Sequence, residues 1–369
     1  MVNNLSFKFK KASEKDVRII IGKLLSKDIN KYLKGIGPDR VFIITDSFVG
    51  LKYGLQIQNT IKKQYPTYLI THPPGEKHKN IKTIGKIIKG FFAGGGTYRS
   101  CICALGGGVT DNMAGFAASI IFRGIKLVHL PTTLLAQLDS APDVKQSINA
   151  PTSKNAIGSY KTPDLVLIDP MFLKTLSERE IKSGIAEALK HGFAQNPQFV
   201  EFIVSSNRNK NLSNINILEK IIHKTILLKI KHWEETPNKW SEPERVERLT
   251  HLGHTIGKSL EIIDVDYLTH GEAISHGMLV EFYISYLLDY LKLDFIIYAR
   301  KIFESLGLLY PLNNLYTVEG IVKDLYPTES VHQPIFALLT NPGNPKTIST
   351  QVPKEIVNKS LKWYFSSKK

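Results

Sequence analysis

Histidines cluster in one short region of the chain. Four of the 11 histidines lie in "HLGHTIGK" at 251–258 and "HGEAISHGM" at 270–278. Among them, His254 and His270 stand in stretches of small residues, which allow close helix packing. "SGIAEALKHG" adds Glu187, a carboxylate on an expected helix whose other face is apolar. One carboxylate and two imidazoles suit a divalent ion such as zinc with an open coordination position. The alternative is that these histidines are structural.

A run of glycines is a second feature that could bind a ligand. Gly107 and Gly108 close the apolar stretch "SCICALGGG" and precede an expected helix that starts near Thr110. Glycine lets a backbone approach a phosphate closely, and a helix N-terminus offers free N–H groups. The run predicts a phosphate or dinucleotide site. It is not the G-x-G-x-x-G fingerprint, so a tight turn without a ligand is the alternative.

Polar residues at the ends of two expected strands fit the same ligand. Asp46 ends "VFIITD", where a carboxylate could accept a hydrogen bond from a ribose hydroxyl. Thr132 and Thr133 place two hydroxyls at the end of "GIKLVHLPTT". Each feature is common by itself, and each agrees with a nucleotide bound beside the glycines.

The elements that must position these residues alternate in the first half of the chain. Short β-branched runs predict strands, and apolar residues at helical spacing predict helices. Strands are expected at 16–22, 39–46, 100–108 and 124–133, and helices at 53–66, 80–96 and 110–122. This alternation predicts a parallel sheet in a nucleotide-binding α/β domain over residues 1–170.

The pattern changes from residue 171 onward. Amphipathic helices are expected at 177–194, 217–235, 248–263 and 270–291, with a polar loop at 236–247. A chain of 369 residues exceeds the size of a single core. We therefore expect an all-α metal- and substrate-binding domain over residues 171–369, with a ligand-binding cleft between the two domains.

Composition narrows the class of protein. Lys and Arg number 48 against 33 Asp and Glu, which gives a formal charge of +15. The lysines are scattered rather than interleaved with aromatic residues, so we expect no nucleic-acid partner and favour attraction of a small anionic substrate. No apolar run is long enough for a membrane span and no signal core opens the chain, so a cytoplasmic protein is expected. Cys101 and Cys103 should face one side of a strand, buried and unpaired.

Several motifs in order along the chain resemble the dehydroquinate synthase-like sugar phosphate cyclases. They are "GGGVTDNMAGFAA", "FRGIKLVHLPTTLLAQLDS", "SKNAIGSY", "SGIAEALKHG", "GHTIG" and "HGEAISHGM", spread from about residue 40 to 285. The resemblance implies an NAD-binding α/β domain followed by a helical domain. It also implies bound NAD and a divalent metal, zinc or alternatively cobalt, held by Glu187, His254 and His270.

The resemblance further implies roles for other residues. NAD contacts would come from Asp46, Glu76, Lys79, Gly107, Gly108, Thr132, Thr133 and Asp139. Catalytic groups would be Lys145, Lys190, Lys229 and His251, and the phosphorylated sugar would meet Lys154, Asn155, Lys258 and Arg123. The implied reaction oxidises a substrate alcohol, eliminates phosphate, returns the hydride and closes the ring by an aldol step. NAD is regenerated, so the enzyme would be a lyase.

Departures from the family pattern favour one branch. Dehydroquinate synthases typically carry "GGK", whereas here Lys145 is followed by Gln146, and Asn112 stands where they have aspartate. Both resemble 2-deoxy-scyllo-inosose synthases, which cyclise glucose 6-phosphate in aminoglycoside pathways. Glu247 and His251 stand where dehydroquinate synthases place an arginine and an asparagine for the substrate carboxylate. A carboxylate facing a carboxylate is repulsive by about 1–4 kcal/mol, which disfavours an acid substrate.

Other departures fit neither branch and leave alternatives open. Lys258 replaces a family histidine, and the C-terminal lysine pair for phosphate is missing; Lys258 or His332 could supply that charge. A 3-dehydroquinate synthase, a metal-dependent polyol dehydrogenase and a non-catalytic NAD- and metal-binding protein are the alternatives. Homodimers are usual in the family, and Arg123 would then reach the partner's site.

Overall fold

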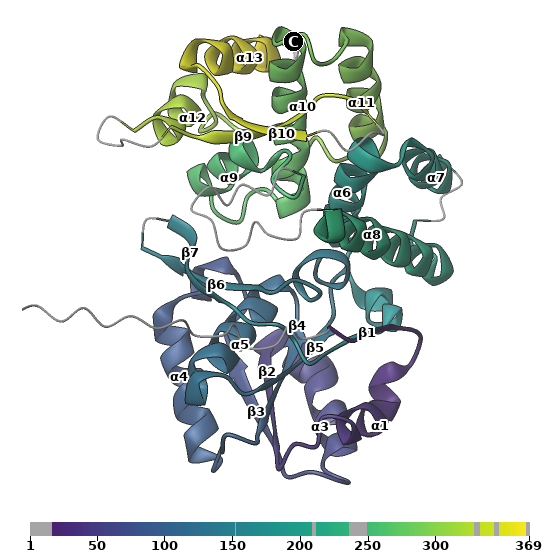
Figure 1. The fold of residues 1–369 in the computed structure, drawn as a ribbon, viewed down its shortest axis with the longest axis vertical. Coiled ribbons are helices and arrows are strands. Elements are labelled where there is room, and N and C mark those ends of the chain that lie inside the picture. Colours follow the sequence, from purple (N-terminus) through teal and green to yellow (C-terminus); the bar gives the residue numbers. More distant parts are fainter. Residues whose placement is uncertain are drawn as a thin grey trace, which may run out of the picture.

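The first part of the chain forms one parallel sheet. The computed structural model describes residues 17–151, 153–208, 212–235, 249–327, 333–342 and 347–366. The strands are β1 (Ile19–Ile21), β2 (Val41–Asp46), β3 (Thr67–His72), β4 (Cys101–Gly106), β5 (Lys126–Pro131) and β8 (Leu165–Ile168). They pair in parallel in the order β1-β8-β5-β4-β2-β3 (Figure 1). The predicted α/β class is confirmed.

Helices cover both faces of this sheet because its strands are apolar on both sides. The helices are α1 (Ile29–Lys34), α2 (Ser47–Val49), α3 (Leu55–Ile61), α4 (Ile81–Ala93) and α5 (Gly108–Ile120). Phe42 and Ile44 of β2 pack with residues of α4 and α5, whereas Val41 and Ile43 pack with α1 and α3. Cys101 and Cys103 share the second face, buried and unpaired as predicted.

Short helical turns connect these elements. They are η1 (Leu25–Asp28), η2 (Gly50–Gly54), η3 (Glu76–His78), η4 (Ile121–Arg123), η5 (Ala136–Ser140) and η6 (Pro170–Thr175). An antiparallel hairpin of β6 (Lys145–Ala150) and β7 (Ser153–Tyr160), which was not predicted, packs on α5 and rises toward the helical part of the molecule (Figure 1).

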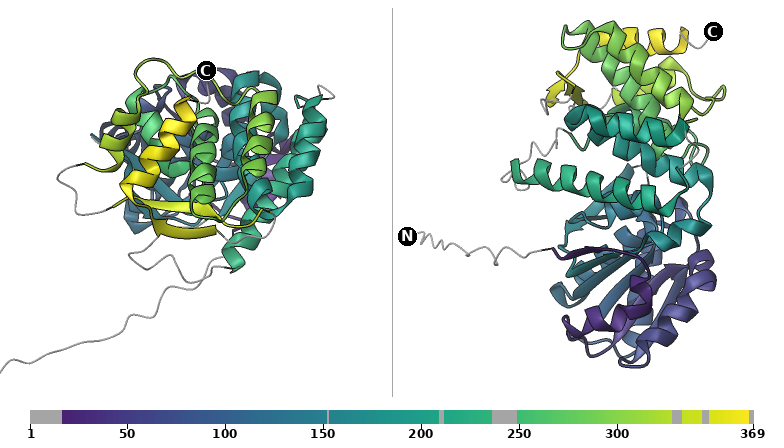
Figure 2. Two further views of the ribbon diagram at one scale, coloured as in Figure 1. Left: turned by 90° about the horizontal axis from the view of Figure 1, so that it is seen from above. Right: turned by 90° about the vertical axis from the view of Figure 1, so that its right-hand side faces the viewer.

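The rest of the chain is mainly helical and stacks on one end of the sheet domain (Figure 2). Its helices are α6 (Glu178–Gln195), α7 (Pro197–Arg208), α8 (Ile215–Glu235), α9 (His254–Ile263), α10 (His270–Leu287), α11 (Leu293–Ser305), α12 (Val318–Leu325) and α13 (Lys354–Ser366). A small antiparallel pair, β9 (Ile335–Leu339) and β10 (Thr347–Gln351), adds strands that the all-helical expectation lacked. None of the described helices combines the length and the apolar character that a membrane span needs.

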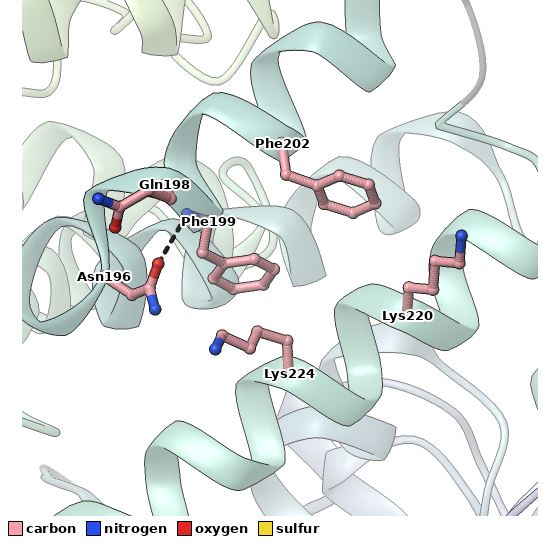
Figure 3. A pocket seen from close by; sticks show the side chains of 6 residues that line it. All are labelled: Asn196, Gln198, Phe199, Phe202, Lys220 and Lys224. Atoms are coloured by element: carbon pink, nitrogen blue, oxygen red, sulfur yellow. Dashed lines mark hydrogen bonds between the residues drawn. The ribbon is translucent and has the colours of Figure 1, made fainter.

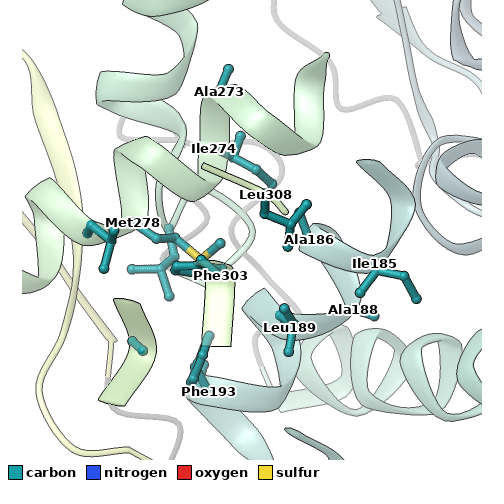
Figure 4. Packing of buried hydrophobic residues seen from close by; sticks show 14 of the residues in the cluster. Ile185, Ala186, Ala188, Leu189, Phe193, Ala273, Ile274, Met278, Phe303 and Leu308 are labelled. Carbon is teal, nitrogen blue, oxygen red and sulfur yellow. The ribbon is translucent and has the colours of Figure 1, made fainter. Parts of the chain in front are cut away.

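Helix α10 is the central helix of this part. Residues 271–282 are all buried, so this stretch of α10 has no face exposed to solvent and is surrounded by other elements. Met278 lies beside Phe303 in the apolar core drawn in Figure 4, and the rings of Phe303 and Phe193 of α6 have centroids 5.6 Å apart. The ring of Phe193 also meets Phe282 edge-to-face, with ring centroids 5.8 Å apart. This packing fixes α6 against α10, which carry two of the predicted metal ligands.

Candidate active site

The three predicted metal ligands converge from three helices. Glu187 lies in the middle of α6, and His254 and His270 are the first residues of α9 and α10. Glu187 Oε1 lies 3.4 Å from His254 Nε2 and 3.2 Å from His270 Nε2. Nitrogen or oxygen ligands at about 2.0–2.1 Å from zinc, at tetrahedral angles, lie roughly 3.3 Å apart. The observed spacing therefore fits an ion of this size.

The protonation of His254 also fits a cation. Nδ1 of His254 donates to the Leu252 carbonyl at 3.1 Å, because a carbonyl can only accept. Burial, and next Lys190, hold the pKa of His254 well below its usual value, so its Nε2 carries a lone pair. That lone pair faces the buried carboxylate of Glu187, an arrangement that a metal ion between them would stabilise. The donor set is therefore suited to zinc or cobalt.

His270 has a carboxylate on each side of its ring. Its Nδ1 lies 3.4 Å from Glu261 Oε1 and its Nε2 lies 3.2 Å from Glu187 Oε1. Burial lowers the pKa of His270, but Glu261 and Glu187 together raise it to about 10. Burial likewise raises the pKa of Glu261, and His270 and then Lys154 lower it to about 2. A metal ion would replace the proton that His270 holds at Nε2.

Close contact between α9 and α10 positions His254 relative to His270. Gly253 adopts a φ of +80°, which ends the preceding turn and begins α9. The carboxylate of Glu281 on α10 accepts hydrogen bonds from the backbone N–H groups of Gly253, Thr255 and Ile256 at the start of α9. These bonds satisfy donors that a helix N-terminus otherwise leaves without partners. Burial raises the pKa of Glu281 to about 8 despite them.

A second set of contacts positions α10 against α6. The Arg179 guanidinium donates to both carboxylate oxygens of Glu272, at 2.8 and 2.7 Å. Glu272 also accepts from the backbone N–H of Thr269, completing a capping box at the start of α10. The backbone N–H of Gly271 donates to Ser183 Oγ at 2.9 Å. The helix that begins at His270 is therefore fixed directly beside the helix of Glu187.

Lysines predicted to act on the substrate surround this centre. Lys190 is buried, contacts the Glu187 carboxylate and donates to the Thr250 carbonyl at 3.0 Å. Lys154 of β7 lies 3.4 Å from Glu261. Burial lowers the pKa of Lys258, and nearby Lys145 lowers it further. The hairpin thus places its lysines beside the metal-ligand helices, in the region between the two parts of the molecule.

Lys229 of α8 joins the helical part to the sheet domain. Its Nζ donates to Asp139 Oδ1 at 2.7 Å and lies 3.3 Å from Asp143 Oδ2. Burial raises the pKa of Asp139, but the opposite effect of Lys229 is larger, so the pKa of this carboxyl lies below its ordinary range. Asp139, predicted to contact NAD, and Lys229, predicted to be catalytic, are therefore an ion pair in this structure.

The predicted nucleotide contacts lie at the carboxyl ends of the strands. Gly107 directly precedes α5 and Gly108 begins it, and a Cβ at Gly107 would lie 3.1 Å from Cγ2 of Thr133. Thr132 is buried. Asp46 already accepts hydrogen bonds from the backbone of Phe48 and Val49, both at 2.9 Å, so it caps its own short helix. Both bonds use Oδ1 of Asp46, so an additional ribose hydroxyl would donate to its Oδ2.

A network of amides connects the hairpin to these nucleotide residues. Asn149 donates to Glu76 Oε1 at 2.8 Å and accepts from the backbone N–H of Asn155 at 2.9 Å. Asn155 adopts a φ of +55°, and its side chain accepts from Lys79. Glu76, Lys79 and Asn155 were predicted to bind two different ligands, and the structure brings them together.

The two residues that set the predicted branch have structural roles. Asn112 Nδ2 donates to the Gly108 carbonyl at 2.8 Å, and its Oδ1 accepts from the backbone N–H of Ser147 at 3.1 Å. Gln146 is buried against α5, and a Cβ at Gly115 would lie 2.0 Å from its Oε1. Both side chains hold the hairpin against α5, and they therefore help to determine where the hairpin residues Lys145, Lys154 and Asn155 lie.

The expectation of one helix over 248–263 is wrong at its start. Residues 249–253 form a turn and α9 begins at His254, because Gly253 takes a positive φ. His251 therefore does not lie one helical turn before His254, although their ring centroids are 6.1 Å apart. Glu247 and His332 lie outside the described residues. Arg123 ends η4 at a φ of +64°, next to the exposed Phe122.

His276 is buried beside the C-terminal helix. Its Nε2 donates to the Tyr310 carbonyl at 2.9 Å, and its Nδ1 contacts the Tyr364 hydroxyl of α13. Sequence reasoning missed Glu261 and Glu281. Glu261 could have been found, because it lies seven residues after His254 and thus on the same face of a helix.

A separate cavity of about 380 Å³ opens between α7 and α8 (Figure 3). Its lining comes from Asn196, Gln198, Phe199, Phe202, Lys220 and Lys224. None of the residues predicted to bind substrate, metal or nucleotide is among them, so the cavity is distinct from the centre described above.

Comparisons with known proteins agree on one family. The models of the 3-dehydroquinate synthase N-terminal and C-terminal domains match residues 69–183 and 184–325. A 2-deoxy-scyllo-inosose synthase of Streptomyces paromomycinus is 33% identical over 289 residues, covering 78% of this chain and 74% of the relative. A 3-dehydroquinate synthase of Clostridium beijerinckii is 39% identical over 273 residues, covering 72% and 75%.

Solved structures give the same picture. A 2-deoxy-scyllo-inosose synthase complexed with carbaglucose-6-phosphate, NAD+ and Co2+ superposes with a TM-score of 0.85 at 26% identity, over 94% of this chain and 96% of that one. A probable glycerol dehydrogenase from Sinorhizobium meliloti shares the fold alone, with a TM-score of 0.66 at 14% identity over 95% and 96% of the two chains. The chain belongs to the 3-dehydroquinate synthase family.

Proposed function

We propose that this protein is an NAD- and metal-dependent sugar phosphate cyclase of the 2-deoxy-scyllo-inosose synthase type. It would convert glucose 6-phosphate to a carbocyclic ketone and phosphate. The observation that carries the proposal is the convergence of Glu187, His254 and His270 beside a group of buried lysines, in a member of a family of cyclases. A relative with this name and a related structure holding a sugar phosphate analogue support the choice of substrate.

Named residues would hold the two cofactors. Glu187, His254 and His270 would bind the metal, and Gly107, Gly108, Thr132, Thr133 and Asp139 would line the NAD site with Asp46, Glu76 and Lys79. When bound, NAD accepts and returns a hydride, and the metal polarises substrate oxygens. The lone pair on His254 Nε2 and the buried carboxylate opposite it support the metal assignment.

The crowding of positive charge supports a phosphorylated substrate. Lys258 is partly buried. Burial, and next Lys145, Lys190 and Lys79, lower its pKa, whereas Glu261 raises it. Lys190 and Lys79 already contact Glu187 and Glu76, and a phosphate dianion would compensate two further positive charges in this group. We assign Lys154 and Lys258 to phosphate, with Asn155 orienting the sugar from its left-handed conformation.

The chain's own residues would then act on protons and charge. In the ketone form of the substrate the adjacent C–H would be acidic, and loss of that proton would expel phosphate. After reduction back to the alcohol, the opened sugar would close by an intramolecular aldol step. Lys145, Lys190 and Lys229 would stabilise the enolate and phosphate charge, with His251 beside them. Because NAD is regenerated, the net reaction is that of a lyase.

A 3-dehydroquinate synthase is the second candidate, and the 39% identity to the Clostridium enzyme favours it. The sequence signals for the inosose branch are Asn112, Gln146 and the glutamate at 247. Turnover of a panel of sugar phosphates, with phosphate release and product mass recorded, separates the two. Phosphate released from glucose 6-phosphate without net NADH supports the proposal. Turnover only of the seven-carbon acid phosphate would replace it, and steady NADH accumulation would indicate a polyol dehydrogenase.

We also propose that the protein is a homodimer to whose site Arg123 of the second copy contributes. Phe122 and Arg123 adopt φ values of +48° and +64°, which cost energy in non-glycine residues. Phe122 is exposed and packs edge-to-face with the exposed Phe92, with ring centroids 5.6 Å apart. Light scattering should give twice the chain mass, and Arg123→Ala should lower activity without changing that mass. A monomeric, active protein would contradict the proposal.

A further inference from the structure

One carboxylate oxygen connects three elements at the candidate metal centre. Oε1 of Glu261, on α9, lies 3.4 Å from His270 Nδ1 on α10 and 3.4 Å from Lys154 Nζ on β7. The side chain of Glu261 is only 13% exposed. Lys154 belongs to the sheet domain and His270 to the helical part, so Glu261 lies where the two parts meet.

The contact with His270 determines which ring nitrogen faces the other ligands. The Nδ1–H group of His270 can donate to Glu261, which leaves its Nε2 directed at Glu187, 3.2 Å away. A histidine that binds a metal through one nitrogen commonly donates from the other to a carboxylate or carbonyl. His254 uses the Leu252 carbonyl for this purpose, at 3.1 Å. His270 instead depends on a side chain, which substitution can remove.

The contact with Lys154 gives the same carboxylate a second task. Lys154 is 17% exposed on its side chain and lies among other lysines, so a nearby negative charge stabilises it in the absence of an anionic ligand. When an anion reaches Lys154, it competes with Glu261 for the ammonium group. Glu261 is then left with His270 as its remaining partner, and its hydrogen bond to Nδ1 should strengthen.

We propose that Glu261 is a positioning residue that holds His270 in its metal-binding orientation and pairs with Lys154 until an anionic substrate takes its place. The inference rests on the proposed function, since it assumes a metal at Glu187, His254 and His270 and a phosphorylated substrate at Lys154. It assigns no contact between Glu261 and the metal itself.

Metal affinity measured with the full-length protein tests the first part. Zn2+ binding is followed by competition with a chromophoric chelator, and the visible spectrum of bound Co2+ reports the coordination geometry. Glu261→Ala should weaken Zn2+ binding about 10- to 100-fold, the range for loss of such a partner, and alter the Co2+ bands. Glu261→Gln keeps an oxygen that accepts from Nδ1 and should recover most of the affinity. This variant also keeps the test valid if Glu261→Ala does not fold.

Two controls separate the outcomes. Glu178→Gln changes an exposed glutamate on the helix of Glu187 and should leave Zn2+ affinity unchanged. Lys154→Ala should leave Zn2+ affinity within about threefold of the parent, well below the change expected at Glu261, while raising KM for glucose 6-phosphate. Parent-like Zn2+ affinity and Co2+ bands in folded Glu261→Ala would overturn this inference alone. A parent protein that binds no stoichiometric metal would overturn the proposed function as well.

The second part predicts coupling between anion and metal. Inorganic phosphate should tighten Zn2+ binding in the parent protein, and this effect should disappear in both Glu261→Gln and Lys154→Ala, because each removes one partner of the pair. Equal tightening by phosphate in the parent and in both variants would overturn the proposed exchange of partners.

Discussion

The backbones of Gly277 and Gly253 touch where α10 crosses the start of α9. A Cβ at Gly277 would lie 2.0 Å from the Gly253 carbonyl oxygen and 2.9 Å from the Gly257 backbone nitrogen. Both obstacles are backbone atoms, which cannot move aside as a side chain can. His254 follows Gly253 directly, so the distance between the two helices decides where its imidazole lies.

Gly277→Ala should therefore force α9 and α10 apart. We expect the free energy of unfolding, measured with urea, to fall by about 1–3 kcal/mol, and Zn2+ affinity to fall with it. The matched control is Gly85→Ala in α4, where a Cβ meets nothing within 4 Å. Because residue 85 is exposed on a helix, this substitution should raise the free energy of unfolding by about 0.5–1 kcal/mol. A Gly277→Ala protein as stable as the parent would contradict this account of the helix crossing.

Glu187→Ala should abolish stoichiometric metal binding. Glu187 Oε1 is the atom that both histidine Nε2 atoms face, so its removal leaves two ligands from separate helices. The loss of affinity should exceed about 100-fold, the upper limit for changes outside the ligand set. Metal analysis of the purified variant by mass spectrometry, beside Glu178→Ala on the same helix, measures it. Full metal occupancy in Glu187→Ala would remove this residue from the ligand set.

Asn112→Asp should destabilise the start of α5, where residue 112 would no longer donate to the Gly108 carbonyl, although the two side chains have nearly the same shape. Asn112 donates to one carbonyl and accepts from Ser147, and an ionised aspartate can only accept. We expect the free energy of unfolding, measured with urea, to fall by about 1–3 kcal/mol, together with weaker NAD binding at the neighbouring glycines. Asn216→Asp is the control, because exposed Asn216 accepts from Lys23 and an aspartate can do the same. Unchanged stability in Asn112→Asp would refute the role assigned to its amide.

The two cysteine thiols should be unreactive in the folded protein. Burial, and next Asp111, raise the pKa of Cys103 to about 12, and burial with Cys103 raises the pKa of Cys101 well above its usual value. Thiolate is the reactive form, so neither should react with Ellman's reagent at pH 8, whereas both should react in guanidinium chloride. Because the folded state favours the protonated thiols, their contribution to stability is full below pH 9 and is lost as the pH rises toward 12. Fast labelling of the native protein would contradict the buried placement.

The sequence predicted four of the six strands of the sheet, because these are short apolar runs followed by glycine or by polar residues, as at Asp46, but it missed β3 and β8. It failed at the β6–β7 hairpin, since most residues of "SKNAIGSY" are exposed and give no apolar alternation. It also failed at the start of α9. There the helical spacing of apolar residues continues through residues 249–253, which form a turn because Gly253 adopts a positive φ.

The candidate site shows the same division between local and long-range signals. Glu187, His254 and His270 could be named because each lies in a local motif of small residues. Glu281 could not, because its partners are the backbone N–H groups of a turn near residue 253. The role of Glu261 depends on Lys154, which is more than a hundred residues earlier in the chain. Contacts of this kind become visible only when the fold brings distant segments together.

His254 and His270 each occupy the first position of a helix, so the partially positive ends of two macrodipoles point toward one spot. A dication placed there gains less than it would at the opposite helix ends, and the single carboxylate of Glu187 neutralises only half its charge. The balance should be restored by a negatively charged oxygen arriving from outside the protein. With the proposed metal bound, such an arrangement would make occupancy by the ion and by an ionised sugar oxygen mutually reinforcing, and it would lower the cost of deprotonating that oxygen at neutral pH.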